Sequence, residues 1–175
     1  MKLSPTEWNP RASAEVNARR RLPRMMSEYF AEVREALKDK PSPARLHSVR
    51  LASKKVRYTL ELFRSCYPAG EFDARLEALK QVQASLGEVN DAVATWRLLA
   101  KIVPHSPRRV ALREFLKQRA AIKAEEFRQL WTEQFDAPGR ERWWTEFWGG
   151  RDGTEREAAV PGHRTGRRPS RQAGA

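Results

Sequence analysis

The stretch Leu46-His-Ser-Val-Arg-Leu-Ala-Ser-Lys-Lys-Val-Arg-Tyr-Thr-Leu-Glu-Leu-Phe63 is predicted to form a helix whose charges have an unusual position. At about 100° per residue, one narrow stripe holds His47, Arg50, Lys54, Arg57 and Glu61. Apolar side chains flank it on both sides, with Val49, Val56, Leu60 and Phe63 on one flank and Leu51, Tyr58 and Leu62 on the other. An ordinary amphipathic helix carries its charges opposite its apolar face.

We refer to His47, Arg50, Lys54 and Arg57 as the basic stripe. An unpaired charge costs several kcal/mol when it is buried without water, so these side chains are not expected in a dry core. We therefore predict that the basic stripe lines a wet groove between helices and faces an anion. The small or polar back of the helix is expected to face solvent and holds Ser48, Ala52, Lys55 and Thr59.

The composition favours a polyanionic partner. The chain has 175 residues, with 34 Lys and Arg against 22 Asp and Glu, a net charge of +12 and a pI near 10.5. Nucleic acid, an anionic membrane surface and a phosphate polymer all fit this charge. Cys66 is the single cysteine, which excludes a disulfide framework and a cysteine-based zinc site. With neither a signal peptide nor a membrane span in the sequence, a cytoplasmic protein is expected.

Helical periodicity dominates the chain, and no strand-like alternation of useful length is found. We predict an all-α protein, an antiparallel up-and-down bundle of about four long helices over residues 13–148 with a short C-terminal helix. Residues 1–12 are expected to be a loose lead. The long helices are predicted at 13–38, where Pro23 suggests a kink or new start near Leu22, then from the Ser42 cap to about Tyr67, at 72–102 and at 108–135, after Ser106-Pro107.

The C-terminal part changes character after Ala137-Pro-Gly139. A cluster of Trp143, Trp144, Phe147 and Trp148 is interpreted as a short helix that packs its rings on the end of the bundle. The alternative is an anchor for a membrane or a partner. Residues 149–175 are rich in Gly, Arg, Ser and Pro and are predicted to be a disordered basic tail.

The third helix has a polar stripe beside its apolar face, which holds Lys80, Gln83, Gly87, Asn90, Asp91 and Ala94. A glycine in mid-helix costs up to about 1 kcal/mol relative to alanine, so Gly87 is expected to let a backbone or a ligand come close. Asp91 is the natural counter-charge for Arg50 or Arg57. Simple ion pairing between helices is the alternative role for Asp91 and for Glu61.

The fourth helix carries Arg119 and Lys123 near the middle of its apolar sector, whose members are Leu112, Phe115, Leu116, Ile122, Phe127 and Leu130. These cations either face a ligand or extend out to water along their aliphatic stems.

His47 lies in the first two turns of its helix, where the helix dipole disfavours the imidazolium form. It is interpreted as a neutral donor to a phosphate oxygen or as a residue that holds its neighbours. The remaining histidines, His105 and His163, are not near any cluster with metal-ligand spacing, so no metal and no cofactor are predicted. No phosphate-binding loop, nucleophile elbow or acid pair with a base is present, and we expect no catalysis.

The motif Leu46-His47-x-x-Arg50-x-x-x-Lys54-Lys55-x-Arg57-Tyr58-x-Leu60-Glu61-Leu62-Phe63 resembles the signature of the CHAD family, the conserved-histidine α-helical domain. Leu79-x-x-x-Gln83-x-x-Leu86-Gly87-x-x-Asn90-Asp91 is similar to the second motif of this family, and Phe127-Arg-Gln-Leu-Trp131 to its closing helix. The resemblance covers roughly residues 22–135.

This resemblance implies a helical domain that binds inorganic polyphosphate in a basic channel without cleaving it. Carried over residue by residue, the ligand side chains are His47, Arg50, Lys54 and Arg57, with Lys80 as a neighbour. We add Arg119 and Lys123 from helical phase alone, and regard Tyr58, Glu61, Gly87 and Asp91 as structural partners of the basic stripe.

One departure from the family pattern concerns the number of halves. The usual domain has two helical halves, each with its own motif, whereas this chain has one that looks more like the second half. Either a half-domain binds through an open groove, or two chains form a homodimer that completes the channel. The ExExK pattern of the triphosphate-tunnel (CYTH) domain, which often accompanies the family, is also absent.

Two other functions fit parts of the sequence. A nucleic-acid-binding bundle is the main alternative, although the cations lie between apolar flanks and are not interleaved with stacking aromatics. Otherwise nucleic acid is expected only as a non-specific competitor. A metal-binding or phosphohistidine protein centred on His47 is the third interpretation. With polyphosphate as ligand, we expect a cytoplasmic location associated with polyphosphate granules.

Overall fold

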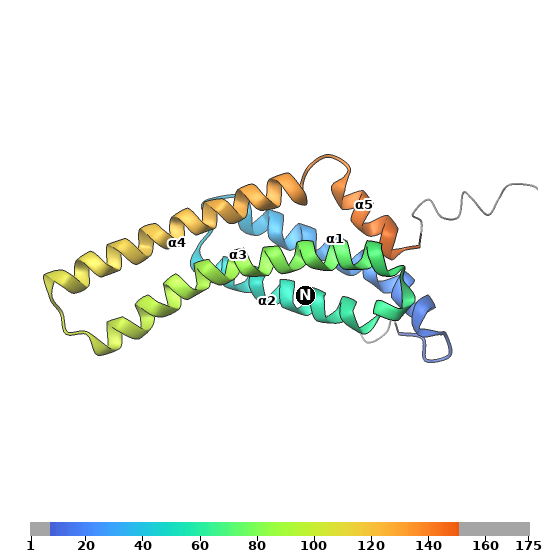
Figure 1. The fold of residues 1–175 in the computed structure, drawn as a ribbon, viewed down its shortest axis with the longest axis horizontal. Helices are drawn as coiled ribbons and strands as arrows, with labels where there is room; N and C mark the ends of the chain where they lie inside the picture. Colours follow the sequence, from blue (N-terminus) through green and yellow to red (C-terminus); the bar gives the residue numbers. More distant parts are fainter. Residues whose placement is uncertain (1–7, 151–175) are drawn as a thin grey trace, which may run out of the picture.

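The computed structural model describes residues 8–150 and is helical throughout its regular parts (Figure 1). The elements are α1 (Ala14–Leu37), α2 (Pro43–Leu62), the short 3-10 helix η2 (Arg64–Cys66), α3 (Ala69–Ile102), α4 (Pro107–Gln134) and α5 (Arg140–Trp148). No strand occurs in the described part of the chain, which confirms the predicted all-α class. The predictions for the loose lead at 1–7 and the basic tail at 151–175 fall outside the described residues.

Serine caps define where three of the helices begin, as the sequence predicts. The hydroxyls of Ser13, Ser42 and Ser106 accept hydrogen bonds from backbone N–H groups three residues on, at 3.2, 3.2 and 3.3 Å. α1 runs through Pro23 as one continuous helix, so the predicted new start at this proline is wrong. Tertiary packing overrides the lost hydrogen bond, because Leu22 and Met26 beside the proline are fully buried.

The core lies where α1, α2 and α3 meet the C-terminal half of α4, and aromatic rings fill one end of it. Trp131 on α4 stacks on Phe135 with ring centroids 4.7 Å apart, and Phe135 stacks in turn on Trp144 of α5 at 5.1 Å. Trp144, Phe147 and Trp148 are at most 1% exposed, which confirms that α5 packs its rings on the bundle.

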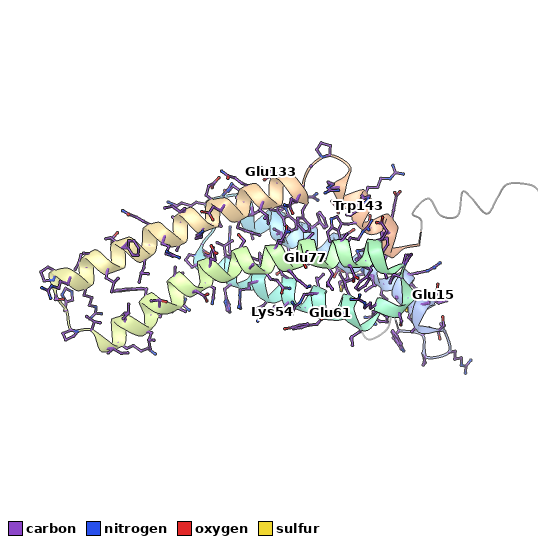
Figure 2. The ribbon with its side chains drawn as sticks, viewed as in Figure 1. Glu15, Lys54, Glu61, Glu77, Glu133 and Trp143 are labelled. Carbon is purple, nitrogen blue, oxygen red and sulfur yellow. The ribbon has the colours of Figure 1, made fainter. Side chains whose placement is uncertain are left out.

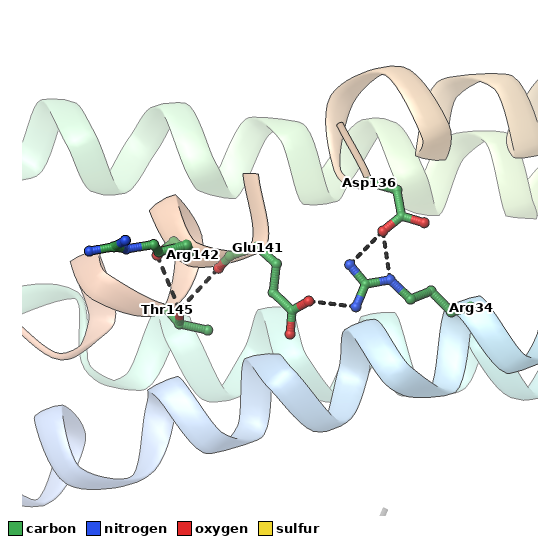
Figure 3. A network of polar contacts seen from close by, with 5 residues as sticks. All are labelled: Arg34, Asp136, Glu141, Arg142 and Thr145. Atoms are coloured by element: carbon green, nitrogen blue, oxygen red, sulfur yellow. Dashed lines mark hydrogen bonds and ion pairs between the residues drawn. The ribbon is translucent and has the colours of Figure 1, made fainter. Parts of the chain in front are cut away.

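The turn between α4 and α5 is tied to α1 by one arginine (Figure 3). Arg34 donates through Nε to the Asp136 carboxylate at 2.6 Å and through Nη1 to the Glu141 carboxylate at 2.5 Å. The hydrogen bond to Asp136, followed by that to Glu141, raises the pKa of Arg34 above its ordinary value. These contacts hold α5 against α1 and close the aromatic end of the core.

The opposite end of the molecule is a two-helix hairpin, in which α3 and α4 extend beyond α1 and α2 (Figure 1). We call residues 93–122 the hairpin. Large apolar side chains on it are more than 45% exposed, namely Leu98, Ile102, Val110, Phe115 and Ile122. Phe115 and Ile122, assigned to the apolar sector of this helix from the sequence, are thus exposed, because this part of α4 has only α3 to pack against in the described chain.

Candidate anion-binding site

Helix α2 presents the basic stripe at the edge of its buried face. The buried residues of the helix are Leu46, Val49, Ala52, Ser53, Val56 and Leu60. Leu51, Tyr58 and Leu62, predicted as a second apolar flank, are 51%, 51% and 79% exposed. The expectation of buried side chains on both flanks is wrong, as is that of a solvent-facing Ala52. α1 and α3 both pack on the same side of α2, and nothing in the described chain covers the other side.

Two hydrogen bonds set the register between α2 and α3. The Nδ1 atom of His47 lies 2.9 Å from Oδ1 of Asn90, and the Gln83 amide donates to the Ser53 carbonyl at 2.9 Å. The helices run antiparallel, so the same register places Gly87 level with Arg50, and Lys80 level with Arg57. The predicted stripes of the two helices therefore meet along one line, which we call the α2–α3 seam.

Arg50 and Arg57 are half-buried in this seam, and the Nε atom of each is buried without a hydrogen-bond partner. Arg57 lies 3.7 Å from the Glu61 carboxylate and has its guanidinium carbon 4.8 Å from the centre of the Tyr58 ring. Tyr58 and Glu61 thus contact the basic stripe as predicted. A buried N–H donor without an acceptor is costly, so an anion bound here would supply acceptors for two donors that the protein leaves without a hydrogen bond.

The lysines of the site are more accessible. Lys54 is half-buried on α2, and Figure 2 shows it with Glu61 on the outer side of that helix. Lys80 is exposed on α3 and pairs with Glu77 of its own helix at 3.1 Å. Because a surface pair of this kind contributes at most about 1 kcal/mol, Lys80 can exchange Glu77 for a stronger acceptor.

Gly87 and Asp91 differ from their expected roles. A Cβ atom added at Gly87 would meet nothing within 4 Å, so no backbone of the described chain approaches it, and the expected approach of a ligand stays a prediction. Asp91 is exposed, and no ion pair among the described residues joins it to Arg50 or Arg57. The expected counter-charge is therefore wrong, because the register carries Asp91 past the level of His47.

Arg119 and Lys123 lie on α4, apart from the basic stripe. The Lys123 ammonium is 2.8 Å from Glu88 on α3 and 2.8 Å from Glu126. Hydrogen bonds to Glu126 and then Glu88 raise the pKa of Lys123, so its charge is already balanced. Arg119 is exposed on the same helix. The structure thus does not bring these two cations into the α2–α3 seam, and their binding role stays a prediction.

A buried polar cluster that the sequence analysis missed supports α2 from behind. Ser53 is fully buried, and its Oγ lies 2.7 Å from the Tyr29 hydroxyl and donates to the Val49 carbonyl at 2.8 Å. Burial raises the pKa of Tyr29. With Gln83 on the Ser53 carbonyl, this cluster fixes α2 on α1 and α3 and hence the direction of the basic stripe. A serine in a row of apolar positions was the available signal.

Within residues 8–150, no group of three or more His, Cys, Asp and Glu side chains is placed to hold a metal ion. Over the same residues, none of the helices combines the length and the apolar character that crossing a membrane requires.

An α-helical domain with a cationic seam between two antiparallel helices is the class that this arrangement defines. Residues 2–100 match the model of the CHAD domain, which is more than half of the 175 residues. The chain belongs to the CHAD family. The matched range ends within α3, so it contains both predicted motifs but not the segment Phe127–Trp131, whose similarity to the closing helix stays a prediction. No curated protein and no solved structure matches the chain.

Proposed function

We propose that this protein binds inorganic polyphosphate along the α2–α3 seam and does not cleave it. The observation that carries the proposal is the pair of buried Nε atoms of Arg50 and Arg57, neither of which makes a hydrogen bond, in one row with His47 and Lys54. Membership of the CHAD family supports the same ligand.

The dimensions of the seam suit a linear polyanion. At about 1.5 Å per residue, the stretch from His47 to Arg57 is roughly 15 Å long, enough for several consecutive phosphates. Charge-assisted hydrogen bonds and the release of counterions would supply the affinity, and there is no sequence to be read. Affinity is therefore expected to rise with chain length and to fall steeply with salt.

The test is titration calorimetry with long-chain polyphosphate against a triple variant, Arg50→Ala, Lys54→Ala and Arg57→Ala. Each charged contact contributes about 1.5–3 kcal/mol, so the loss of three contacts should lower the affinity by at least about 1,000-fold. A control variant with the same loss of charge is Arg20→Ala, Lys101→Ala and Arg108→Ala, whose residues are exposed and lie outside the seam. Equal binding by the two triple variants would refute the site, and circular dichroism should show unchanged helicity in both.

Nucleic acid is the alternative ligand, and the structure gives a reason to rank it lower. Arg50 and Arg57 are half-buried between α2 and α3. A helix that reads the major groove of DNA must instead present its cations on a convex exposed face. Competition between polyphosphate and duplex DNA at equal phosphate concentration separates the two. Preference for DNA would overturn the polyphosphate proposal.

Within residues 8–150 nothing covers the outer side of the α2–α3 seam, and we propose that a second copy of the chain covers it once polyphosphate is bound. Leu51, Tyr58 and Leu62 border the basic stripe and are exposed, so they are available for such a contact. Without ligand, the basic stripes of two copies would repel each other. Light scattering with a molar excess of short polyphosphate chains should show the mass of two copies, and the mass of one copy without ligand. An unchanged mass would establish an open groove on a monomer.

A further inference from the structure

One hollow of the described chain lies away from the basic stripe. It is a groove of about 740 Å³ between the α1–α2 loop, α3 and α4, where the hairpin leaves the bundle. We call it the hairpin groove. None of the basic-stripe residues lines it. Its volume falls within the range of about 300–1,000 Å³ that ligand sites occupy, yet its shape is long and open.

The floor of the hairpin groove is apolar and shallow-sided. Val89, Val93 and Trp96 on α3 face Leu116 on α4 across it. Further along α4 the lining consists of Ala120, Ala121 and Ala124. Small side chains at a contact let two helix backbones approach to the short end of the usual packing distance of about 8–10 Å. The floor therefore has the surface on which another helix packs.

The length of the hairpin groove fits a short helix. Its α4 wall runs from Leu116 to Arg128, which is roughly 18 Å at about 1.5 Å per residue and thus about three helical turns. Arg128 donates to the Asp39 carbonyl at 2.9 Å, so the α1–α2 loop is fastened to α4 at this end. The groove is accordingly a preformed feature between fixed walls.

The rim of the hairpin groove is mainly cationic. Lys38 and Lys40 stand on the α1–α2 loop, and Lys117 and Arg128 on α4, against Asp39 and Glu125 as the acidic lining residues. Lys38, Lys40 and Lys117 are exposed. An apolar stripe between cationic edges is complementary to an apolar stripe between carboxylates.

We propose that the hairpin groove is a docking site for an acidic amphipathic helix of a partner protein. A bilayer is too flat to enter a trough between two helices and a loop, and polyphosphate has no apolar surface to cover the floor. A second copy of the chain is a poor occupant. Its exposed apolar residues stand near cations, such as Leu51 and Tyr58 beside Lys54 and Lys55, and would meet the cationic rim with like charge. Helix-in-groove binding of this kind needs apolar anchors at helical spacing.

The probe is a fluorescein-labelled peptide of about 15 residues with leucine at alternating spacings of three and four and with glutamate and alanine elsewhere. The wild-type protein should bind it, and the peptide should gain helicity. Ala121→Phe fills the groove from an exposed position and should weaken binding at least about tenfold. The matched control is Ala111→Phe, an exposed alanine on α4 outside the groove, which should leave affinity within about twofold.

Charge is tested separately. Lys117→Glu on the rim should weaken binding several-fold, whereas Lys101→Glu, an exposed lysine of the same hairpin outside the groove, should have a smaller effect. The triple variant of the basic stripe should bind the peptide with the affinity of the wild type. A failure of the docking proposal can therefore be distinguished from a failure of the polyphosphate site.

Three outcomes would overturn the docking proposal. The first is equal binding of a peptide with the same composition in scrambled order, which would show attraction to any polyanion. The second is normal peptide binding by Ala121→Phe. The third is that Ala121→Phe leaves peptide binding unchanged but alters another property of the protein. A change in the mass of the free protein would assign the groove to a second copy, and a change in sedimentation with phosphatidylglycerol vesicles would assign it to lipid.

Discussion

Replacing Gly87 by alanine should make the protein more stable and, at the same time, a weaker polyphosphate binder. Gly87 lies in the interior of α3, and an added Cβ would meet nothing within 4 Å, so the methyl group fits without strain. Alanine is favoured over glycine in a helix interior by about 0.5–1 kcal/mol. For a chain of this size, that gain corresponds to a rise in Tm of about 1–4 °C.

Binding should move in the opposite direction. Gly87 stands level with Arg50 in the register of α2 and α3, so a side chain at this position would extend into the open space that we expect the phosphates to cross. We expect Gly87→Ala to weaken polyphosphate binding by about threefold and Gly87→Leu, which fills the seam more completely, by at least about tenfold.

The assay pairs thermal unfolding with polyphosphate titration on the same samples. Gly70→Ala is the control, since a Cβ at Gly70 also meets nothing within 4 Å but Gly70 lies in the first turn of α3, at the far end from Asn90. Normal polyphosphate binding by Gly87→Leu would refute the path of the phosphates over this residue. A fall in Tm for Gly87→Ala would refute the open space inferred above it.

Three further perturbations test other parts of the structure. Burial raises the pKa of Tyr29, so above a pH of about 10 the unfolded state loses a proton that the folded state keeps. This residue should therefore lower the unfolding free energy by about 1.4 kcal/mol per pH unit in that range. The unfolding free energy of Tyr29→Phe, measured by denaturation, should decline less steeply with alkaline pH, and a slope identical to that of the wild type would contradict this expectation. Arg34→Ala should cost about 0.5–1 kcal/mol, because the half-exposed pairs with the carboxylates of the α4–α5 turn are screened by water, and the cost should shrink in 1 M salt when urea unfolding is compared at both ionic strengths. Asn90→Ala removes the hydrogen-bond partner that orients His47, and should weaken polyphosphate binding as much as His47→Ala does. The double variant should show no further loss of affinity, whereas additive losses would mean that the two side chains act separately.

Local signals in the sequence were sufficient to locate the starts of α2 and α4. A serine followed by a proline predicts a helix start, because the serine side-chain oxygen caps free N–H groups and the proline has a fixed φ that suits the first turn. This pair occurs at Ser42-Pro43 and at Ser106-Pro107, and a helix begins at both. The row of cations on α2 was equally visible, since helical phase depends only on spacing along the chain. The family match over residues 2–100 spans both predicted motifs.

Helical phase does not determine which neighbouring helices cover a given face, and the predicted burial of apolar side chains was wrong on α2 for this reason. Leu51 and Tyr58 have the right residue types for a core but face solvent, because burial depends on where α1 and α3 pack. The same holds for Phe115 on a hairpin that leaves the bundle.

The sequence by itself determined an all-α chain with cations in a row on α2 and a glycine-containing polar stripe on α3. Only the tertiary structure decided that these two stripes share one seam, in which Gly87 lies level with Arg50, because the register between helices is set by contacts such as that of His47 with Asn90. It also placed Lys123 on α4 outside the seam, paired with Glu88. It also decided that one side of the seam lies uncovered, since the presence of a covering wall is a property of packing and not of spacing along the chain.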